Sequence, residues 1–313
     1  MLSRRLLRVK VMQTVYSYSQ SGEQTLDAAE TELYHSISKS HELYHALLLF
    51  PIALADYAQK RIEAGRNKIR PTADEMNPNL RFVNNKLIAQ LRENESLLSY
   101  VDSTGLSWVN NEDYLSKFFN NLIASKFYTD YMTMSDDSYE EDKKFIINLI
   151  SKRLAYDEMF YETMENTSIY WNDEIEFIIS IVTKTLKDFN INSKANQPLL
   201  PEFKDKEDAL FVKMLFRNAI ANNSAALELI KKFSQNWDAE RVALLDVILI
   251  RLAMAEIESV PDIPIKVTMN EYIEISKYYS TEKSHIYING ILEKIINYLV
   301  ENKKILKERL PQA

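Results

Sequence analysis

The sequence contains no cysteine and only four glycines among its 313 residues. Without cysteine the chain forms neither disulfides nor thiolate metal sites, which fits a reducing compartment. The glycines are scattered, so there is no G-x-G-x-x-G fingerprint and no P-loop, and nucleotide enzymes of the Rossmann and Walker types are excluded. No run of eighteen apolar residues occurs, and the first residues lack the apolar core of a secretory signal. We therefore expect a cytoplasmic protein with no membrane segment.

What the sequence does contain is typical of a helical globular protein. Hydrophobic residues make up 46% of the chain and charged residues 27%. Apolar residues recur at helical spacing and few stretches alternate like strands, so we expect an all-α fold. The segment 244–255 is apolar nearly all round, which is typical of a helix at the centre of a bundle.

The charge of the chain is unevenly distributed. The net charge is -7, which argues against a protein that coats nucleic acid indiscriminately. Residues 1–22 nevertheless carry Arg4, Arg5, Arg8 and Lys10 and no acidic residue. The three arginines share one arc of a helix expected from about Ser3 to Ser19, where they oppose the helix dipole and bound phosphates would relieve that cost. A defined anion site or an ordinary basic terminus would both explain the pattern.

A second cationic face is expected near the carboxyl end. A helix that begins at about Thr281 places Lys283, Tyr287, Gly290 and Lys294 on one side. The lysines could hold phosphates, and the tyrosine could stack a base of single-stranded RNA. A glycine within a helix costs about 1 kcal/mol relative to alanine, so it suggests close approach of a packed helix or of a ligand. Just upstream, the spacing of Thr268 and Glu271 predicts a capping box at the start of another helix.

The sequence His41-Glu42-Leu43-Tyr44-His45 has the H-E-x-x-H spacing of zinc hydrolases. Such a site needs a third ligand, and only Glu63 offers itself. The simpler interpretation is a set of polar residues on one face of a long helix. We therefore expect no catalytic residue, no metal and no cofactor, and keep a zinc hydrolase as an alternative.

Two stretches resemble the bacterial transcription antitermination factor NusB family. The segment IPIKVTMNEYIEISKYYSTEKSHIYINGILEK resembles the carboxyl-terminal signature of that family. The matching positions are Asn270, Glu271, Glu274, Lys277, Ser284, Asn289, Gly290 and Leu292. The segment RRLLRVKVMQTVYSY resembles its arginine-rich opening, matched by Arg4, Arg5, Arg8, Gln13 and Tyr16. The chain departs from the family pattern at Lys283, where an acid is common, and at Tyr287, where phenylalanine is usual.

The resemblance implies a fold, a function and a set of contacts. The fold is an all-α, NusB-like helical bundle (1–40 and 205–302) with a long inserted helical region (41–204) and a basic tail (303–313). The function is antitermination through boxA-like single-stranded RNA, bound together with the ribosomal protein NusE, with the RNA polymerase elongation complex as an indirect partner. The expected RNA contacts are Arg4, Arg5, Arg8, Gln13, Lys283, Ser284, His285, Tyr287 and Lys294. Tyr16 is the expected partner contact.

This hypothesis requires the arginine-rich first turns and the Lys283–Lys294 face to meet as one groove for an unpaired strand. A protein-only helical scaffold, in which the long insertion binds partners, is the remaining alternative.

Overall fold

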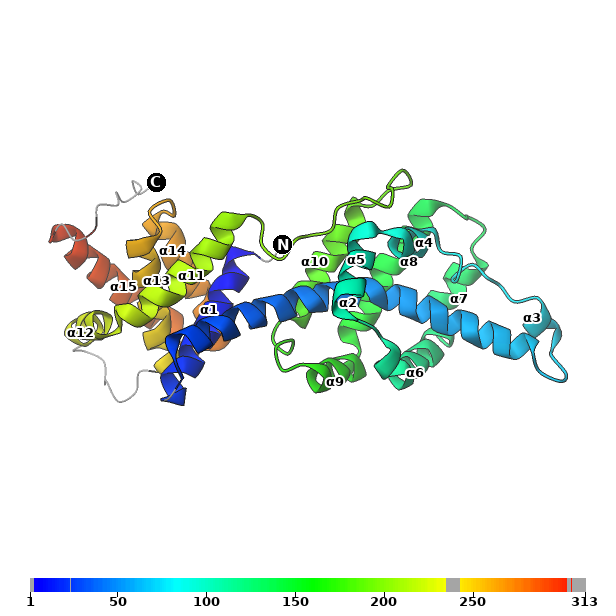
Figure 1. Cartoon of the computed structure of the whole chain (residues 1–313), viewed down its shortest axis with the longest axis horizontal. Helices are drawn as coiled ribbons and strands as arrows, with labels where there is room; N and C mark the ends of the chain where they lie inside the picture. Colours follow the sequence, from blue (N-terminus) through cyan, green and yellow to red (C-terminus); the bar gives the residue numbers. More distant parts are fainter. Residues whose placement is uncertain (1–2, 23, 235–242, 303–304, 306–313) are drawn as a thin grey trace. The chain divides into compact units, whose positions relative to one another are not determined.

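The computed structural model describes residues 3–22, 24–234, 243–302 and 305, and every regular element within them is a helix (Figure 1). The prediction of an all-α fold is thus confirmed. The chain divides into two units: a terminal unit of Met1–Ile37 and Glu202–Ala313, and a central unit of Ser38–Pro201. The basic tail expected over 303–313 lies outside the described residues, apart from position 305.

The terminal unit is a bundle of helices from the two ends of the chain. The long helix α2 belongs to it only as far as Ile37 and continues into the central unit. The helices are α1 (Arg4–Ser21), α2 (Leu26–Arg66), α11 (Lys206–Ala221), α12 (Asn223–Phe233), α13 (Leu244–Ser259), α14 (Ile265–Tyr279) and α15 (Ser284–Glu301).

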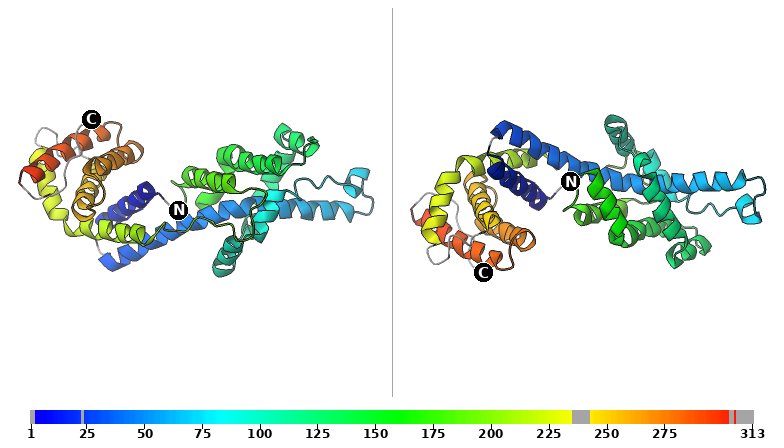
Figure 2. Two further views of the ribbon diagram at one scale, coloured as in Figure 1. Left: turned by 90° about the horizontal axis from the view of Figure 1, so that it is seen from above. Right: turned by 90° about the horizontal axis from the view of Figure 1, so that it is seen from below.

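Helix α13 lies at the centre of the terminal unit, as its all-round apolar sequence predicted. It packs against α1, α11, α12, α14 and α15, and Figure 2 shows this bundle from two further sides. Apolar side chains on all its faces are buried, among them Ile248, Leu249, Ile250 and Leu252. Burying each such side chain stabilises the folded state by about 1.5–3 kcal/mol, so α13 forms the core of this unit.

The start of α14 differs from the expectation. The helix begins at Ile265, after Pro264, and no side chain caps it. Thr268 and Glu271 do not form a capping box: the Thr268 hydroxyl donates to Glu256 at 2.8 Å, and Glu271 binds Arg5. Pro264 is the N-cap residue, with φ -59° and ψ 141°, and no side chain accepts a hydrogen bond from the first backbone N–H groups of α14.

The central unit contains the rest of α2 and a set of shorter helices. Pro51 lies inside α2, which is helical on both sides of it. The shorter elements are α3 (Ala73–Met76), α4 (Lys86–Glu93), α5 (Glu95–Thr104), η1 (Val109–Asn111), α6 (Glu112–Ile123), α7 (Lys126–Thr133), α8 (Tyr139–Asn148), η2 (Leu149–Arg153), η3 (Leu154–Tyr156), α9 (Glu158–Thr167) and α10 (Ile175–Asp188).

Aromatic side chains fill much of the core of the central unit. The ring of Phe50 on α2 packs edge-on against Trp108 and Phe118, with centroids 5.1 and 5.2 Å away. The ring of Phe145 on α8 stacks on Tyr131 at 3.9 Å. These contacts join α2, α6, α7 and α8. Within the described parts of the chain, no helix is both long and apolar enough to cross a membrane.

Candidate nucleic-acid interface

Helix α1 begins with a local cap and a row of cations. The Ser3 hydroxyl accepts a hydrogen bond from the Leu6 backbone N–H at 3.2 Å, which fixes the first turn. Arg4 and Arg5 follow, with no acidic residue in that turn. The helix start therefore concentrates positive charge, and the partners of these arginines decide whether that charge is available.

Arg4 and Arg5 are half-exposed, and each binds a carboxylate of the terminal unit. Arg4 Nε donates to Asp208 on α11 at 2.8 Å, and Arg5 donates twice to Glu271 on α14, at 2.9 and 2.8 Å. The Arg5 and Arg4 side chains keep 49% and 40% of their surface exposed. The hydrogen bond from Arg5 lowers the pKa of Glu271. These carboxylates therefore supply the charge compensation that we expected from bound phosphates.

Arg8, an expected RNA contact, is buried in the terminal unit. Only 3% of its surface is exposed, and its guanidinium donates twice to Glu256 on α13, both at 2.7 Å. Burial lowers the pKa of Arg8, but the hydrogen bonds and the charge of Glu256 outweigh burial and raise it. Phe211 and Tyr272 cover the guanidinium at 5.3 and 6.0 Å. Arg8 thus holds α1 to the bundle.

Two other expected RNA contacts, at the start of α15, are also buried. Ser284 donates to Asp246 on α13 at 2.9 Å. Tyr287 is 4% exposed, and its hydroxyl is hydrogen-bonded to Ser234 at 2.9 Å. Burial raises the pKa of Tyr287. A ring that packs in the bundle cannot stack a base without leaving its place.

The other predicted contacts on α15 are accessible. Lys283 and Lys294 are exposed, His285 is partly exposed, and neither lysine has a carboxylate partner among the described residues. A Cβ atom at Gly290 would meet no atom within 4 Å in the described chain, so no packed helix requires that glycine. The alternative of a ligand on the exposed face stays open.

The two predicted contacts further along α1 lie on its outer side. Gln13 is partly exposed, and Tyr16 keeps 41% of its surface. Both positions are therefore accessible to a partner. Neither lies in the first turn with Arg4 and Arg5.

The two basic segments lie at different ends of α13 and not side by side. Arg8 binds Glu256, whereas Ser284 binds Asp246, and these two acids are ten positions apart on α13. Ten residues of α-helix rise about 15 Å. Helix α14 spans the same interval, because Thr268 binds Glu256 and Ser280 binds Asp246, so a strand along the outer side of α14 would reach both segments.

An aromatic residue that the sequence reasoning missed lies on that path. Tyr278 on α14 is 80% exposed. The pKa of Arg5 is raised first by its hydrogen bonds to Glu271 and further by the charges of Glu271, Glu274 and Tyr278, so the phenol lies within electrostatic range of Arg5. The sequence spacing could have identified this residue. Tyr278 follows Glu274 by four residues and Glu271 by seven, so it shares their face of α14, outside the apolar stripe.

The H-E-x-x-H residues pack inside the central unit. His41 Nε2 is hydrogen-bonded to the Leu200 carbonyl at 2.9 Å, and His45 Nδ1 to the His41 carbonyl at 2.8 Å. The His45 ring stacks on Tyr100 at 3.7 Å, and Glu42 pairs with Lys39. No group of three potential ligands that could hold a metal ion occurs in the described parts of the chain. The two imidazoles serve packing, which argues against the zinc hydrolase alternative.

The terminal unit is thus an all-α bundle around a buried α13, with accessible cations at both ends of that helix. The model of the NusB family matches residues 174–297. This match includes α11 to α14, nearly all of α15, and also α10 of the central unit, while α1 lies outside it.

Three curated relatives share this similarity, and each is named a transcription antitermination protein NusB. The Dictyoglomus turgidum protein is 33% identical over 120 residues, 38% of this chain and 83% of its own length. The Salinibacter ruber protein is 33% identical over 108 residues, 34% of this chain and 68% of its own length. The Natranaerobius thermophilus protein is 46% identical over 72 residues, 23% of this chain and about half (52%) of its own length. No solved structure matches the chain. This chain belongs to the NusB family.

Proposed function

We propose that this chain acts in transcription antitermination, without catalysis, by binding boxA-like single-stranded RNA together with a NusE-type ribosomal protein. It would act on the RNA polymerase elongation complex indirectly, in the cytoplasm. The observation that carries the proposal is the family match over residues 174–297, because this segment includes the exposed Lys283 and Lys294. The relatives are transcription antitermination proteins, and the process is taken from them.

The burial of the predicted residues assigns them different roles in this proposal. Lys283 and Lys294, exposed and without carboxylate partners among the described residues, hold phosphates. Arg4 and Arg5 contribute only where a phosphate displaces Asp208 or Glu271 from them, so their net effect on RNA affinity is smaller than that of the two lysines. Arg8, Ser284 and Tyr287 hold the helices in place. Gln13 and His285 are partly exposed and contribute polar contacts.

Tyr278 takes the stacking role that the sequence reasoning gave to Tyr287. It is the exposed aromatic on α14, between Arg5 and the turn that precedes Lys283. A base stacked on an aromatic side chain contributes about 1–3 kcal/mol, or about 5- to 150-fold in affinity. Exposed tyrosine beside cations is the arrangement that recognises unpaired strands.

Fluorescence anisotropy with a labelled boxA-like oligonucleotide tests these roles. Tyr278→Ala is expected to weaken binding at least fivefold. Tyr287→Phe is the matched control: it removes only the hydroxyl that binds Ser234 and should leave RNA affinity within twofold. If Tyr278→Ala left the affinity for RNA unchanged, the assignment of the stacking residue would be wrong.

Tyr16 is our proposed contact for the NusE-type protein, because it is exposed on α1 and belongs to the arginine-rich opening. Tyr16→Ala should weaken binding of that protein and leave the affinity for RNA alone unchanged. The scaffold alternative predicts a different result: a boxA-like and a scrambled oligonucleotide would bind equally weakly, with or without the partner.

A further inference from the structure

The terminal unit contains a cavity of about 440 Å³ that the proposed function does not use. It lies between the end of α1 with the turn that follows it, the junction of α11 and α12, and the first half of α13. This volume is within the range of small-molecule and peptide side-chain sites. None of the residues that we assign to RNA or to the NusE-type protein is part of the lining.

A buried arginine without a counter-ion lines this cavity. Arg251 on α13 is 6% exposed, and its Nη2 donates to the Ala219 carbonyl at 3.0 Å. Its Nε is buried without a hydrogen-bond partner, and it forms no ion pair with a carboxylate of the described chain. Arg8, which is equally buried, has Glu256 as its counter-ion. A buried charge without an opposite charge is unfavourable, so this cavity presents a cation that lacks its anion.

A second buried polar group in the lining also lacks a partner. Asn223 is the first residue of α12, and its Oδ1 is buried and accepts no hydrogen bond from the described residues. An unsatisfied buried acceptor is costly, and a ligand with an N–H group would satisfy it. That donor should be uncharged, because no acidic residue among the described part of the lining could balance a second positive charge.

The rest of the wall is largely apolar, and it is not packed away. Ile220, Leu227 and Val247 are only partly buried, and Leu244 is 39% exposed. An inorganic anion would gain nothing from these side chains, whereas an anion with an apolar group would bury that group against them. The wall therefore favours an anion that carries an apolar side chain.

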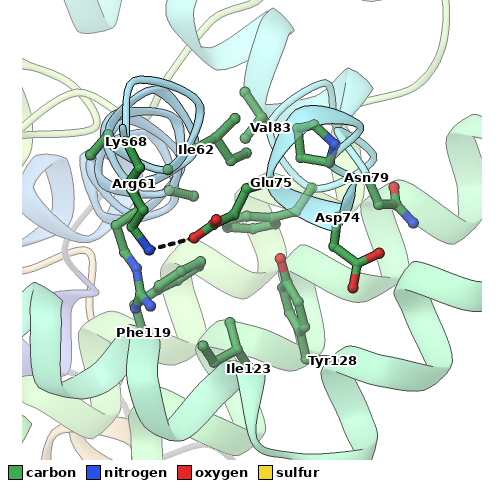
Figure 3. Close-up of a pocket in the computed structure, with 15 residues that line it drawn as sticks. Arg61, Ile62, Lys68, Asp74, Glu75, Asn79, Val83, Phe119, Ile123 and Tyr128 are labelled. Carbon is green, nitrogen blue, oxygen red and sulfur yellow. Dashed lines mark hydrogen bonds and ion pairs between the residues drawn. The ribbon is translucent and has the colours of Figure 1, made fainter. Parts of the chain in front are cut away.

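A cavity of similar volume in the central unit lacks these features (Figure 3). It measures about 490 Å³, and its buried rings already stack on each other, with the centroids of Phe82 and Phe119 6.2 Å apart. Figure 3 shows that its Lys68 pairs with Glu75. None of the described residues that line it has a buried side-chain polar atom without a partner. Unsatisfied buried groups thus single out the cavity of the terminal unit.

We propose that the cavity of the terminal unit binds the carboxyl-terminal residue of a partner protein whose last side chain is apolar. Arg251 pairs with the terminal carboxylate, whose two coplanar oxygens suit the guanidinium. Asn223 accepts a hydrogen bond from the amide N–H of that residue, and the apolar side chain packs on Ile220, Leu227 and Val247. A free amino acid fits less well, because its ammonium group finds no acidic partner in the described lining. An RNA phosphate has neither the N–H donor nor the apolar group.

Isothermal titration of the full chain with N-acetyl-glycyl-leucine tests this site, and the carboxamide of the same compound is the matched control. We expect the acid to bind and the carboxamide to bind at least tenfold more weakly, because it cannot form the ion pair. N-acetyl-glycyl-serine retains the carboxylate without the apolar side chain, and free leucine replaces the amide N–H by an ammonium group. Each of these two should bind at least fivefold more weakly than N-acetyl-glycyl-leucine.

Two variants and one control decide whether the cavity is the site. Arg251→Met removes the cation and Asn223→Ala removes the acceptor, and each should weaken binding of the acid at least fivefold. Ser224→Ala is the control: this serine is exposed on α12 outside the lining, and its loss should change binding less than twofold. Arg251→Met should not destabilise the terminal unit in hydrogen exchange, because it removes a buried charge that has no partner there, whereas Arg8→Met should.

The proposal would be overturned if the acid did not bind, if acid and carboxamide bound equally, or if both cavity variants left binding unchanged. The segment 235–242, outside the described residues, contains Asp238 and Glu240. Binding of the acid only after Asp238→Asn with Glu240→Gln would identify the chain's own carboxylate as the occupant and overturn the proposal as well. Arg251→Met should leave the affinity for boxA-like RNA within twofold, so a failure of this proposal is distinguishable from a failure of the proposed function.

Discussion

The buried ion pair between Arg8 and Glu256 should contribute more to stability than any other contact of α1. Glu256 has no exposed surface, and it accepts two hydrogen bonds from Arg8 at 2.7 Å, one from Thr268 at 2.8 Å and one from Tyr272 at 3.0 Å. Arg8→Met leaves this carboxylate buried with only two neutral donors. Breaking a buried pair by removing one partner costs about 3–5 kcal/mol, and we expect a loss in that range.

A double-mutant cycle separates the pair from the packing around it. Glu256→Gln retains an acceptor for Thr268 and Tyr272 but leaves the Arg8 charge without its closest partner. The double variant, Arg8→Met with Glu256→Gln, contains neither buried charge. It should therefore be more stable than the sum of the two single losses predicts, by about 2 kcal/mol. Arg5→Met is the control, because the exposed Arg5–Glu271 pair should contribute less than about 1 kcal/mol.

The assay has to follow the terminal unit by itself, since a chain of two units need not unfold in one step. Native-state hydrogen exchange, read by mass spectrometry on peptides of α1 and α13, reports the local free energy of opening. Peptides of α6 in the central unit serve as an internal reference. If the stability loss of the double variant equalled the sum of the two single losses within about 0.5 kcal/mol, Arg8 and Glu256 would not be energetically coupled and the prediction would be refuted.

Three further predictions address other parts of the chain. Burial lowers the pKa of His45 to about 4, below its unfolded value of 6.5. Between pH 4 and pH 6.5 the unfolded state therefore binds more protons than the folded state. The central unit should thus lose stability, on the order of 3 kcal/mol, as the pH falls from 6.5 to 4. His45→Phe should reduce this acid sensitivity in pH-dependent urea denaturation, while burial of His41, which also lowers its pKa, retains part of it; an unchanged pH profile would contradict the assignment. Gly290→Ala should stabilise the terminal unit by about 0.5–1 kcal/mol, because a Cβ there is free of contacts in the described chain; destabilisation would show that the open space is occupied. Lys283→Asp should weaken RNA binding and reduce the slope of log K against log salt by about 0.7, whereas Lys184→Asp, on the exposed side of α10, should leave the slope unchanged.

The features that follow from helical periodicity could be predicted from the sequence. The central position of α13 is one, because a helix that is apolar on all sides has to be surrounded by other helices. The start of α14 was predicted wrongly, because the spacing of Thr268 and Glu271 suits a capping box as well as the tertiary bonds they make with Glu256 and Arg5. Local spacing cannot tell these apart.

The candidate site was harder to predict, because a motif identifies residues but does not indicate whether they are buried. Arg8 and Tyr287 match or approximate family positions, yet each binds a partner within the bundle. The partners come from distant segments, 248 and 53 residues away, and no local pattern connects them. Tyr278 was missed for the converse reason: it lies outside the quoted matches, although its helical phase already placed it beside Glu271 and Glu274.

The most direct test of the account is an anisotropy titration of the full chain with boxA-like and scrambled RNA, over a range of salt, with and without the NusE-type protein. We expect tighter binding of the boxA-like strand at every salt concentration, with a larger difference when the partner is present. Equal affinity for the two strands under all conditions would contradict it.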